Sequence, residues 1–237
     1  MQLPLFALHA VLFPHLPMSL HVFEPRYRAM AADLVAEGSP FAGRLVISMI
    51  TDGPEVGGDA LSQPIGTVAE LRSAEQLSDG RWGLSVVGVA RARLTEVERD
   101  GAYPLARVAE LAEPMGDGAA EMVPAVQAAL DRYLATVKRF VVRATSGGEH
   151  QHETADVTDS LDDLLKPIHL PGDPVAASYA VGGVLQVELT RKQRLLEIPD
   201  AAARLHAELV LLRTEARLLG DGELPTVPTA DLTYHPN

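Results

Sequence analysis

The chain of 237 residues contains no cysteine. This absence excludes disulfides, thiolate metal sites and a cysteine nucleophile. The sequence also has no uninterrupted apolar run of about 18 residues, the length that a membrane-spanning helix needs. Its N-terminus lacks the basic region, long apolar stretch and small-residue cleavage site of a signal peptide. Together these absences predict a soluble, cytoplasmic protein.

The usual signatures of nucleotide-driven and hydrolytic chemistry are missing as well. No Gly-x-x-x-x-Gly-Lys-[Ser/Thr] loop, with which ATPases hold phosphates, occurs in the sequence. No Gly-x-Ser-x-Gly occurs either, since the nearest approach, Gly83 to Gly88, has the wrong spacing and lies in a predicted strand. We therefore expect neither catalytic residues nor a cofactor. A hydrolase whose catalytic triad assembles from distant residues stays an alternative.

Positive charge is scarce. The 20 lysines and arginines face 32 aspartates and glutamates, which gives a net charge of −12 at pH 7. Such a balance opposes the approach of phosphate backbones and anionic membranes, and the sequence contains no basic run that would offset it. The charge argues against nucleic-acid and membrane partners.

Two histidine patterns are candidates for metal sites. His150-x-His152-Glu153 offers imidazole and carboxylate ligands, and histidine recurs every six residues from His9 to His21. Neither pattern has the spacing of a known metal site, and an interval of six fits no single face of a strand or helix. We expect no metal.

The first half of the chain reads as extended segments separated by turns. One helix interrupts them, because Pro25 suits a first helical position, apolar residues recur at helical spacing and Gly38 can end the helix. Five or six short strands that helices do not separate favour a small, twisted, partly closed barrel over a parallel sheet. The clearest predicted strands are Arg44–Ile50, Ile65–Leu71, Trp82–Leu94 and Tyr103–Leu111, with a hairpin turn at Asp79-Gly80.

After Gly118 the apolar spacing becomes helical. Asp173-Pro174 and Asp200 are helix starts, Thr190-x-x-Gln193 has the form of a capping box, and Gly220 can end the last helix. The acidic segment from Gly147 to Asp163 reads as a surface loop and the proline-containing end as an extended tail. The predicted helices are Glu121–Ala144, Val175–Leu185, a short helix holding Leu195 and Leu196, and one from Asp200 to Leu219.

This pattern divides the chain into three parts. Residues 1–117 form the β subdomain with one inserted helix, residues 118–220 form a helical subdomain and residues 221–237 form the tail. The predicted fold class is α+β.

Several segments in a fixed order resemble one known family. They are Leu3-Pro4-Leu5-Phe6, Val11-Leu12-Phe13-Pro14, Leu20-His21-Val22-Phe23-Glu24-Pro25-Arg26-Tyr27-Arg28, Gly66–Leu71, Gly88–Arg93, Tyr103–Val108 and Lys192–Glu197. The family is the N-terminal, substrate-binding domain of Lon proteases, in particular the free-standing Lon-N-like proteins of bacterial type that carry no ATPase or protease domain. The resemblance implies a PUA-like β-barrel followed by a C-terminal α-helical bundle. One departure is His15, which stands where the family has a glycine, so the loop must form without the freedom of glycine at positive φ.

In the parent proteases this domain helps to recognise substrates. The resemblance therefore implies a non-catalytic module that binds an unfolded or extended polypeptide, or a protease or chaperone partner, as an adaptor in protein quality control. Two alternatives stay open: an RNA-binding protein, because PUA-like barrels often bind RNA, and a peptidase-associated hydrolase.

The candidate peptide-binding residues cluster at a predicted strand-to-helix junction. In a structural reading, Glu24 accepts backbone N–H groups at the helix start and pairs with Arg26 or Arg28, while Phe23 and Tyr27 fill the core. In a functional reading, an arginine or the tyrosine edge projects into a groove between barrel and helices and contacts an extended peptide. A tryptophan after the hairpin turn packs in the core or rim, or contacts ligand. The candidates are Phe23, Glu24, Arg26, Tyr27, Arg28 and Trp82.

Overall fold

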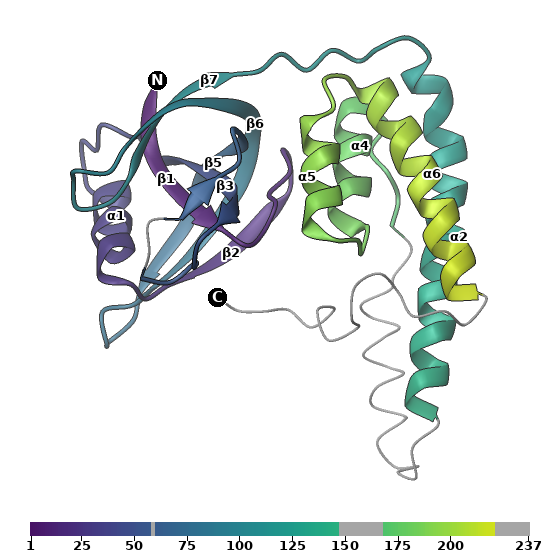
Figure 1. Cartoon of the computed structure of the whole chain (residues 1–237), viewed down its shortest axis with the longest axis horizontal. Coiled ribbons are helices and arrows are strands. Elements are labelled where there is room, and N and C mark those ends of the chain that lie inside the picture. Colours follow the sequence, from purple (N-terminus) through teal and green to yellow (C-terminus); the bar gives the residue numbers. More distant parts are fainter. Residues whose placement is uncertain (58–59, 147–167, 221–237) are drawn as a thin grey trace. The chain divides into compact units, whose positions relative to one another are not determined.

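The fold is described from a computed structural model that places residues 1–57, 60–146 and 168–220 (Figure 1). These residues form seven strands and five helices. They divide into two compact units, and each is described by itself. Unit 1 holds Met1–Glu113 and Leu189–Ile198, and unit 2 holds the described parts of Pro114–Glu188 and Pro199–Tyr234.

Unit 1 is built on one mixed sheet. Strand β6 is its longest element and pairs with three neighbours: β5 along most of its length, β2 near its start and β7 near its end. A β-bulge or similar irregularity interrupts each of the long pairings, which lets long strands bend. The strands are β1 (Gln2–Leu8), β2 (Pro17–Val22), β3 (Arg44–Asp52), β4 (Leu61–Ser62), β5 (Ile65–Gln76), β6 (Trp82–Glu98) and β7 (Leu105–Glu110).

The pairings of five of these strands close on themselves. Strand β1 pairs antiparallel with β7 and in parallel with β3, while β7, β6, β5 and β3 follow one another in the sheet. Strands β2 and β4 lie outside this ring, on β6 and β3 respectively. Among the described strands β2 therefore pairs along one edge only.

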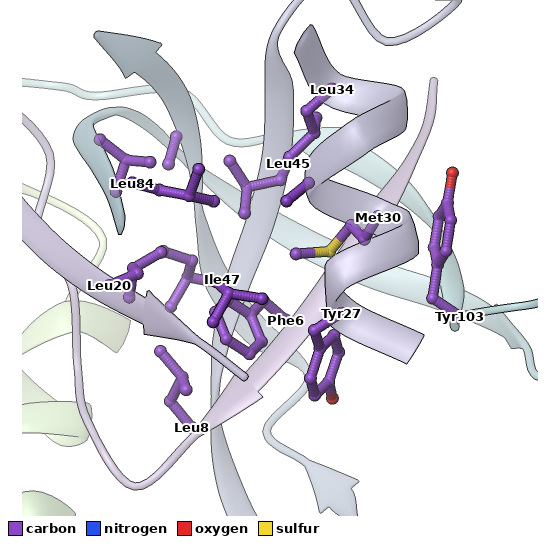
Figure 2. Close-up of a cluster of buried hydrophobic side chains, with 14 of the residues drawn as sticks. Phe6, Leu8, Leu20, Tyr27, Met30, Leu34, Leu45, Ile47, Leu84 and Tyr103 are labelled. Atoms are coloured by element: carbon purple, nitrogen blue, oxygen red, sulfur yellow. The ribbon is translucent and has the colours of Figure 1, made fainter. Parts of the chain in front are cut away.

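The core of unit 1 lies on both faces of the strands. The larger cluster gathers side chains from β1, β2, β3 and β6 against helix α1 (Pro25–Val35), whose Tyr27, Met30 and Leu34 point into it (Figure 2). A second cluster includes Leu5, Val46 and Val68. A Cβ at Gly88 would meet the carbonyl oxygen of Phe13, so β6 approaches this loop as closely as only glycine allows.

Helix α5 (Leu189–Glu197) belongs to unit 1, although it follows the other elements of that unit only after a long stretch of the sequence. Arg91 of β6 is 2% exposed and donates to the carbonyl oxygens of Leu196 at 3.0 Å, Ile198 at 2.7 Å and Ala112 at 3.1 Å. It also pairs with the carboxylate of Glu113 at 2.7 Å. One guanidinium thus ties the end of α5 to the sheet.

Gln193 makes the second link between α5 and the sheet. Its amide Nε2 donates to the carbonyl oxygen of Ile65 at 2.9 Å, whereas its Oε1 has no hydrogen-bond partner among the described residues. The predicted capping box is therefore wrong: α5 begins before Thr190, and the glutamine side chain serves the sheet instead of the helix start.

Unit 2 consists of α2 (Ala119–Ser146), α4 (Pro174–Val184) and α6 (Ala201–Gly220), with α6 in contact with both others. The predicted helix starts are confirmed. Asp173 accepts the Ala176 N–H at 2.8 Å, and Asp200 accepts the Ala203 N–H at 2.8 Å. Because both carboxylates satisfy backbone donors that the helix cannot, they fix where α4 and α6 begin.

The interior of unit 2 contains ionisable groups. Arg204 of α6 is fully buried, donates to Ser178 Oγ at 2.7 Å and stacks 4.1 Å from the ring centroid of Tyr179. Glu208, one turn later, is also fully buried, and neither carboxylate oxygen has a hydrogen-bond partner among the described residues. Burial raises the pKa of Glu208 well above its usual value, although the charge of Arg204 acts in the opposite direction.

The order of strands followed by helices agrees with the sequence prediction, but several boundaries do not. Strands β5 and β6 run to Gln76 and Glu98, beyond the predicted ends at Leu71 and Leu94, and the two-residue β4 was not predicted. The acidic segment 147–163 and the tail 221–237 lie outside the described residues. The domain boundaries at 117/118 and 220/221 stay predictions. None of the helices described is both long and apolar enough to cross a membrane.

Candidate functional site

The predicted junction connects β2 to α1. Glu24 stands at the N-cap position of α1, but its side chain makes no capping hydrogen bond. Its Oε2 instead accepts the N–H of Gly57 at 2.9 Å and lies 3.2 Å from Arg26 Nη2. The predicted pairing with Arg26 is confirmed, whereas the predicted capping role of the carboxylate is wrong. Glu24 holds the loop after β3.

Tyr27 occupies the core, as the structural reading predicted. It is 4% exposed, and its ring centroid lies 4.4 Å from that of Phe6 in a tilted arrangement (Figure 2). The guanidinium of Arg26 stacks 4.6 Å from the centroid of the same ring. Burial raises the pKa of the Tyr27 phenol, and the charge of Arg26 reduces this effect. The Tyr27 side chain therefore contributes an uncharged aromatic surface to the site.

Phe23 does not fill the core, and this part of the structural reading is wrong. Its side chain is 43% exposed, which is far from the burial of a core residue. Leu20 and Val22 of β2 point inward, so the alternation along the strand turns the following Phe23 outward. An exposed phenylalanine beside a pocket is a feature of binding surfaces.

Arg28 and Trp82 lie elsewhere. The guanidinium of Arg28 lies against Gly80 in the hairpin between β5 and β6, where an added Cβ would collide with it. Trp82 is half-buried, pairs with Val22 across the sheet and packs against the larger core cluster. The structure therefore brings together Phe23, Glu24, Arg26 and Tyr27 but leaves these two outside the pocket described next.

A pocket of about 290 Å³ opens beside β2 and the end of β1. Its lining is mainly apolar, and Phe6, Leu8, Leu20 and Tyr27, all labelled in Figure 2, belong to both the pocket and the core cluster. Small-molecule sites typically enclose about 300–1,000 Å³. This pocket lies at the lower end of that range and suits one or two amino-acid side chains.

The rim of the pocket combines polar and apolar side chains from separate segments. Phe23 and Glu24 come from the junction before α1, and Glu55 and Val56 come from the loop after β3. Glu55 Oε2 accepts the backbone N–H of His9 at 2.7 Å and lies 3.0 Å from Nδ1 of the same residue. With the bond from Gly57 to Glu24, two carboxylates hold this loop against the pocket.

Arg26 lines a second, smaller pocket of about 190 Å³ together with Tyr27 and Tyr103. The Tyr103 hydroxyl donates to Asp33 Oδ2 at 2.6 Å, and its pKa is raised by burial first and by the Asp33 carboxylate second. Tyr27 lines both pockets, so the predicted residues are divided between two neighbouring pockets.

Sequence reasoning missed His9, His21, Glu55 and Val56 as parts of the pocket. The loop 53–57 carried turn signals only, and its contact with His9 spans 46 positions, which no local pattern can show. Among the described residues no cluster of three or more histidine or acidic side chains could hold a metal ion. His150, His152 and Glu153 lie outside the described residues.

Comparisons with known proteins agree with this fold. The family model of the substrate-binding domain of the ATP-dependent protease La (LON) matches residues 2–214. The chain belongs to this family. That model describes the substrate-binding domain, not the ATPase or protease part of Lon.

Individual relatives are distant in sequence. Lon protease 2 of Syntrophobacter fumaroxidans is 23% identical over 209 residues, which are 88% of this chain and 24% of that protein. The chain thus spans about a quarter of the length of this curated relative.

Two solved structures show the same fold. The N-terminal domain of Mycobacterium avium complex Lon protease has a TM-score of 0.60 at 17% identity, covering 90% of this chain and 98% of that one. A Lon N-terminal domain protein of Xanthomonas campestris has a TM-score of 0.57 at 19% identity, covering 89% of this chain and 98% of that one.

Proposed function

We propose that this chain is a non-catalytic module that binds extended or unfolded polypeptide, and that the pocket beside β2 receives an apolar side chain of the bound segment. Membership of the LON substrate-binding family supports polypeptide as the kind of partner. The observation that carries the proposal is an apolar pocket with a 43% exposed phenylalanine at its mouth. A buried apolar anchor surrounded by a polar rim is the usual arrangement of a protein-binding surface.

The position of β2 supports an extended partner. Among the described strands β2 pairs only with β6, so alternate residues on its other edge direct backbone N–H and C=O groups away from the sheet. Residues Met18 to Val22 of this strand also line the pocket. A peptide added along this edge would gain main-chain hydrogen bonds that tolerate many sequences, while the pocket selects for an apolar residue.

The experiment measures binding of a fluorescently labelled 12-residue peptide rich in leucine, valine and phenylalanine to the purified chain by fluorescence anisotropy. We expect Phe23→Ser to weaken binding about tenfold or more, in line with the loss of one interface anchor. Because Phe23 is exposed, the midpoint of urea unfolding should not change.

Val35→Ser is the matched control, since Val35 is 42% exposed on α1 and does not line the pocket. Its affinity should stay within twofold of the wild type. Equal affinities for Phe23→Ser and Val35→Ser, or no binding by the wild type, would contradict the proposal. Cleavage of the peptide by the purified chain alone would contradict its non-catalytic part.

We also propose a finer description of the two units. The closed ring of five strands supports a PUA-like barrel, and the contacts of α6 with α2 and α4 support a small helical bundle. In this view the barrel carries the peptide site, and the chain acts as an adaptor that delivers polypeptide to a protease or chaperone. Arg26, Arg28 and Trp82 stay candidates for contacts beyond the pocket.

A further inference from the structure

A second surface, in unit 2, differs in chemistry from the pocket beside β2. Helices α2 and α6 border a trough of about 770 Å³. Four exposed arginines line it in two pairs: Arg132 and Arg139 on α2, and Arg213 and Arg217 on α6. Lys138 adds a fifth cationic side chain. We call this surface the arginine trough.

The trough is locally cationic in a chain of net charge −12. None of the described residues that line it is acidic. Between the charged side chains the lining consists of small or aliphatic residues, including Ala135, Leu212 and Ala216. Side chains seven or four positions apart share one helix face, so each pair of arginines faces the same side of its helix.

We propose that the arginine trough binds an acidic, extended segment of a partner protein. Arginine is the residue best suited to hold carboxylates, because its planar guanidinium forms paired hydrogen bonds with them. Arg213 and Arg217 are separated by about 6 Å along their helix, and Arg132 and Arg139 by about 10 Å. In an extended chain, acidic residues two positions apart lie on the same face at about 7 Å from each other, which is close to the separation of Arg213 and Arg217.

The lining favours an acidic peptide over nucleic acid. Proteins that bind single strands usually stack bases on aromatic side chains, and none of the described residues lining the trough is aromatic. The alanine and leucine floor instead suits the aliphatic side chains of a peptide. The trough also lies in a different unit from the pocket beside β2, so the two proposals can fail separately.

The test uses the full chain and two labelled 12-residue peptides, one with glutamate and the other with glutamine at alternate positions, and leucine or alanine between them. We expect the glutamate peptide alone to bind, with an affinity that falls as salt concentration rises. The double variant Arg213→Gln, Arg217→Gln should reduce this affinity about tenfold or more. The double variant Arg72→Gln, Arg107→Gln removes the same charge from exposed positions of unit 1 and should stay within twofold of the wild type.

Two more variants and an RNA probe complete the test. The pair Arg132→Gln, Arg139→Gln should weaken binding as well, and Phe23→Ser should not. Failure of the glutamate peptide to bind, equal binding of the glutamine peptide, or equal losses in the control variant would overturn the proposal. Tighter binding of a 12-nucleotide single-stranded RNA that the same trough variants abolish would also overturn it, in favour of a nucleic-acid site.

Discussion

At the scale of single residues, His15 shows that the loop after Phe13 forms without the glycine expected from the resemblance. This histidine has φ of 66°, a left-handed conformation that favours glycine, while its N–H donates to the Gly88 carbonyl at 2.8 Å. A side chain in this conformation costs about 1–2 kcal/mol. The loop after Phe13 therefore forms with a non-glycine residue at positive φ, and His15 carries the strain.

This strain gives a prediction. His15→Gly should have a free energy of unfolding about 1 kcal/mol higher than His15→Ala, because both variants remove the imidazole and only glycine relieves the backbone. Urea unfolding followed by circular dichroism would measure the difference. Equal stabilities of the two variants would mean that the loop is not strained at this position.

The residues between β2 and α1 show which side-chain positions could be predicted from the sequence and which could not. Burial of Tyr27 was predictable from its helical spacing with Met30 and Leu34, and it is confirmed. The exposure of Phe23 follows from the alternation of Leu20 and Val22 along β2, whereas the aromatic character of the side chain favoured burial. The bond between Glu24 and Gly57 joins positions 33 apart, which no sequence pattern reveals.

At the scale of elements, α5 depends on Arg91. This buried side chain satisfies three carbonyl oxygens and pairs with Glu113. Arg91→Ala should lower the free energy of unfolding by about 3–5 kcal/mol, because it leaves buried acceptors unsatisfied. Arg91→Lys should lose much of the same energy, since an ammonium cannot reach four acceptors with the geometry of a guanidinium.

Urea unfolding is again the measurement, with Arg93→Ala as the control. Arg93 is exposed two positions further along β6 and should change stability by no more than about 0.5 kcal/mol. If Arg91→Ala were as mild as Arg93→Ala, the proposed role of Arg91 in holding α5 would be refuted.

The sequence predicted a helix around Leu195 and Leu196 but not its place. Helical periodicity reports which face of a helix is buried, not the element against which it packs. Thr190 and Gln193 have the spacing of a capping box, but the buried Gln193 side chain donates a hydrogen bond to a backbone carbonyl of the sheet. The helix starts at Asp173 and Asp200 were predicted correctly, because a capping hydrogen bond joins residues that are close in the sequence.

At the scale of the whole molecule, Glu208 should shape the dependence of stability on pH. Its pKa is raised in the folded state by burial, so folding favours the protonated carboxyl. Below its ordinary value of 4.5 the group is protonated in both states and costs nothing. As pH rises through the interval between that value and the folded pKa, the folded state loses stability relative to the unfolded one.

Glu208→Gln should therefore equal the wild type in stability below pH 4.5 and exceed it increasingly at higher pH. Thermal unfolding between pH 4 and 8 would measure the difference, with the exposed Glu98→Gln as the control for a general change in charge. Parallel curves for the wild type and Glu208→Gln would contradict a raised pKa.

The succession of strands and then helices was predictable because alternation and helical spacing are local. The pairings that close the sheet were not predictable, since β1 pairs with β3 and β7 across about forty and a hundred positions respectively. The pocket could not be predicted for the same reason, because its lining comes from β1, β2, α1 and the loop after β3, which are far apart in the sequence. The expected function could be inferred from the sequence motifs alone. The position of the pocket could be found only from the folded structure.

The return of α5 to the sheet has a consequence for synthesis. A ribosome that has released residues 1–113 has not yet made Leu189–Ile198, and all of α2 and α4 is translated in between. At usual rates of about 5–20 residues per second, Arg91 waits several seconds for the carbonyls that it will bind. Unit 1 thus cannot finish folding until α5 has been made, and during that interval the nascent sheet exposes the surface that α5 will cover.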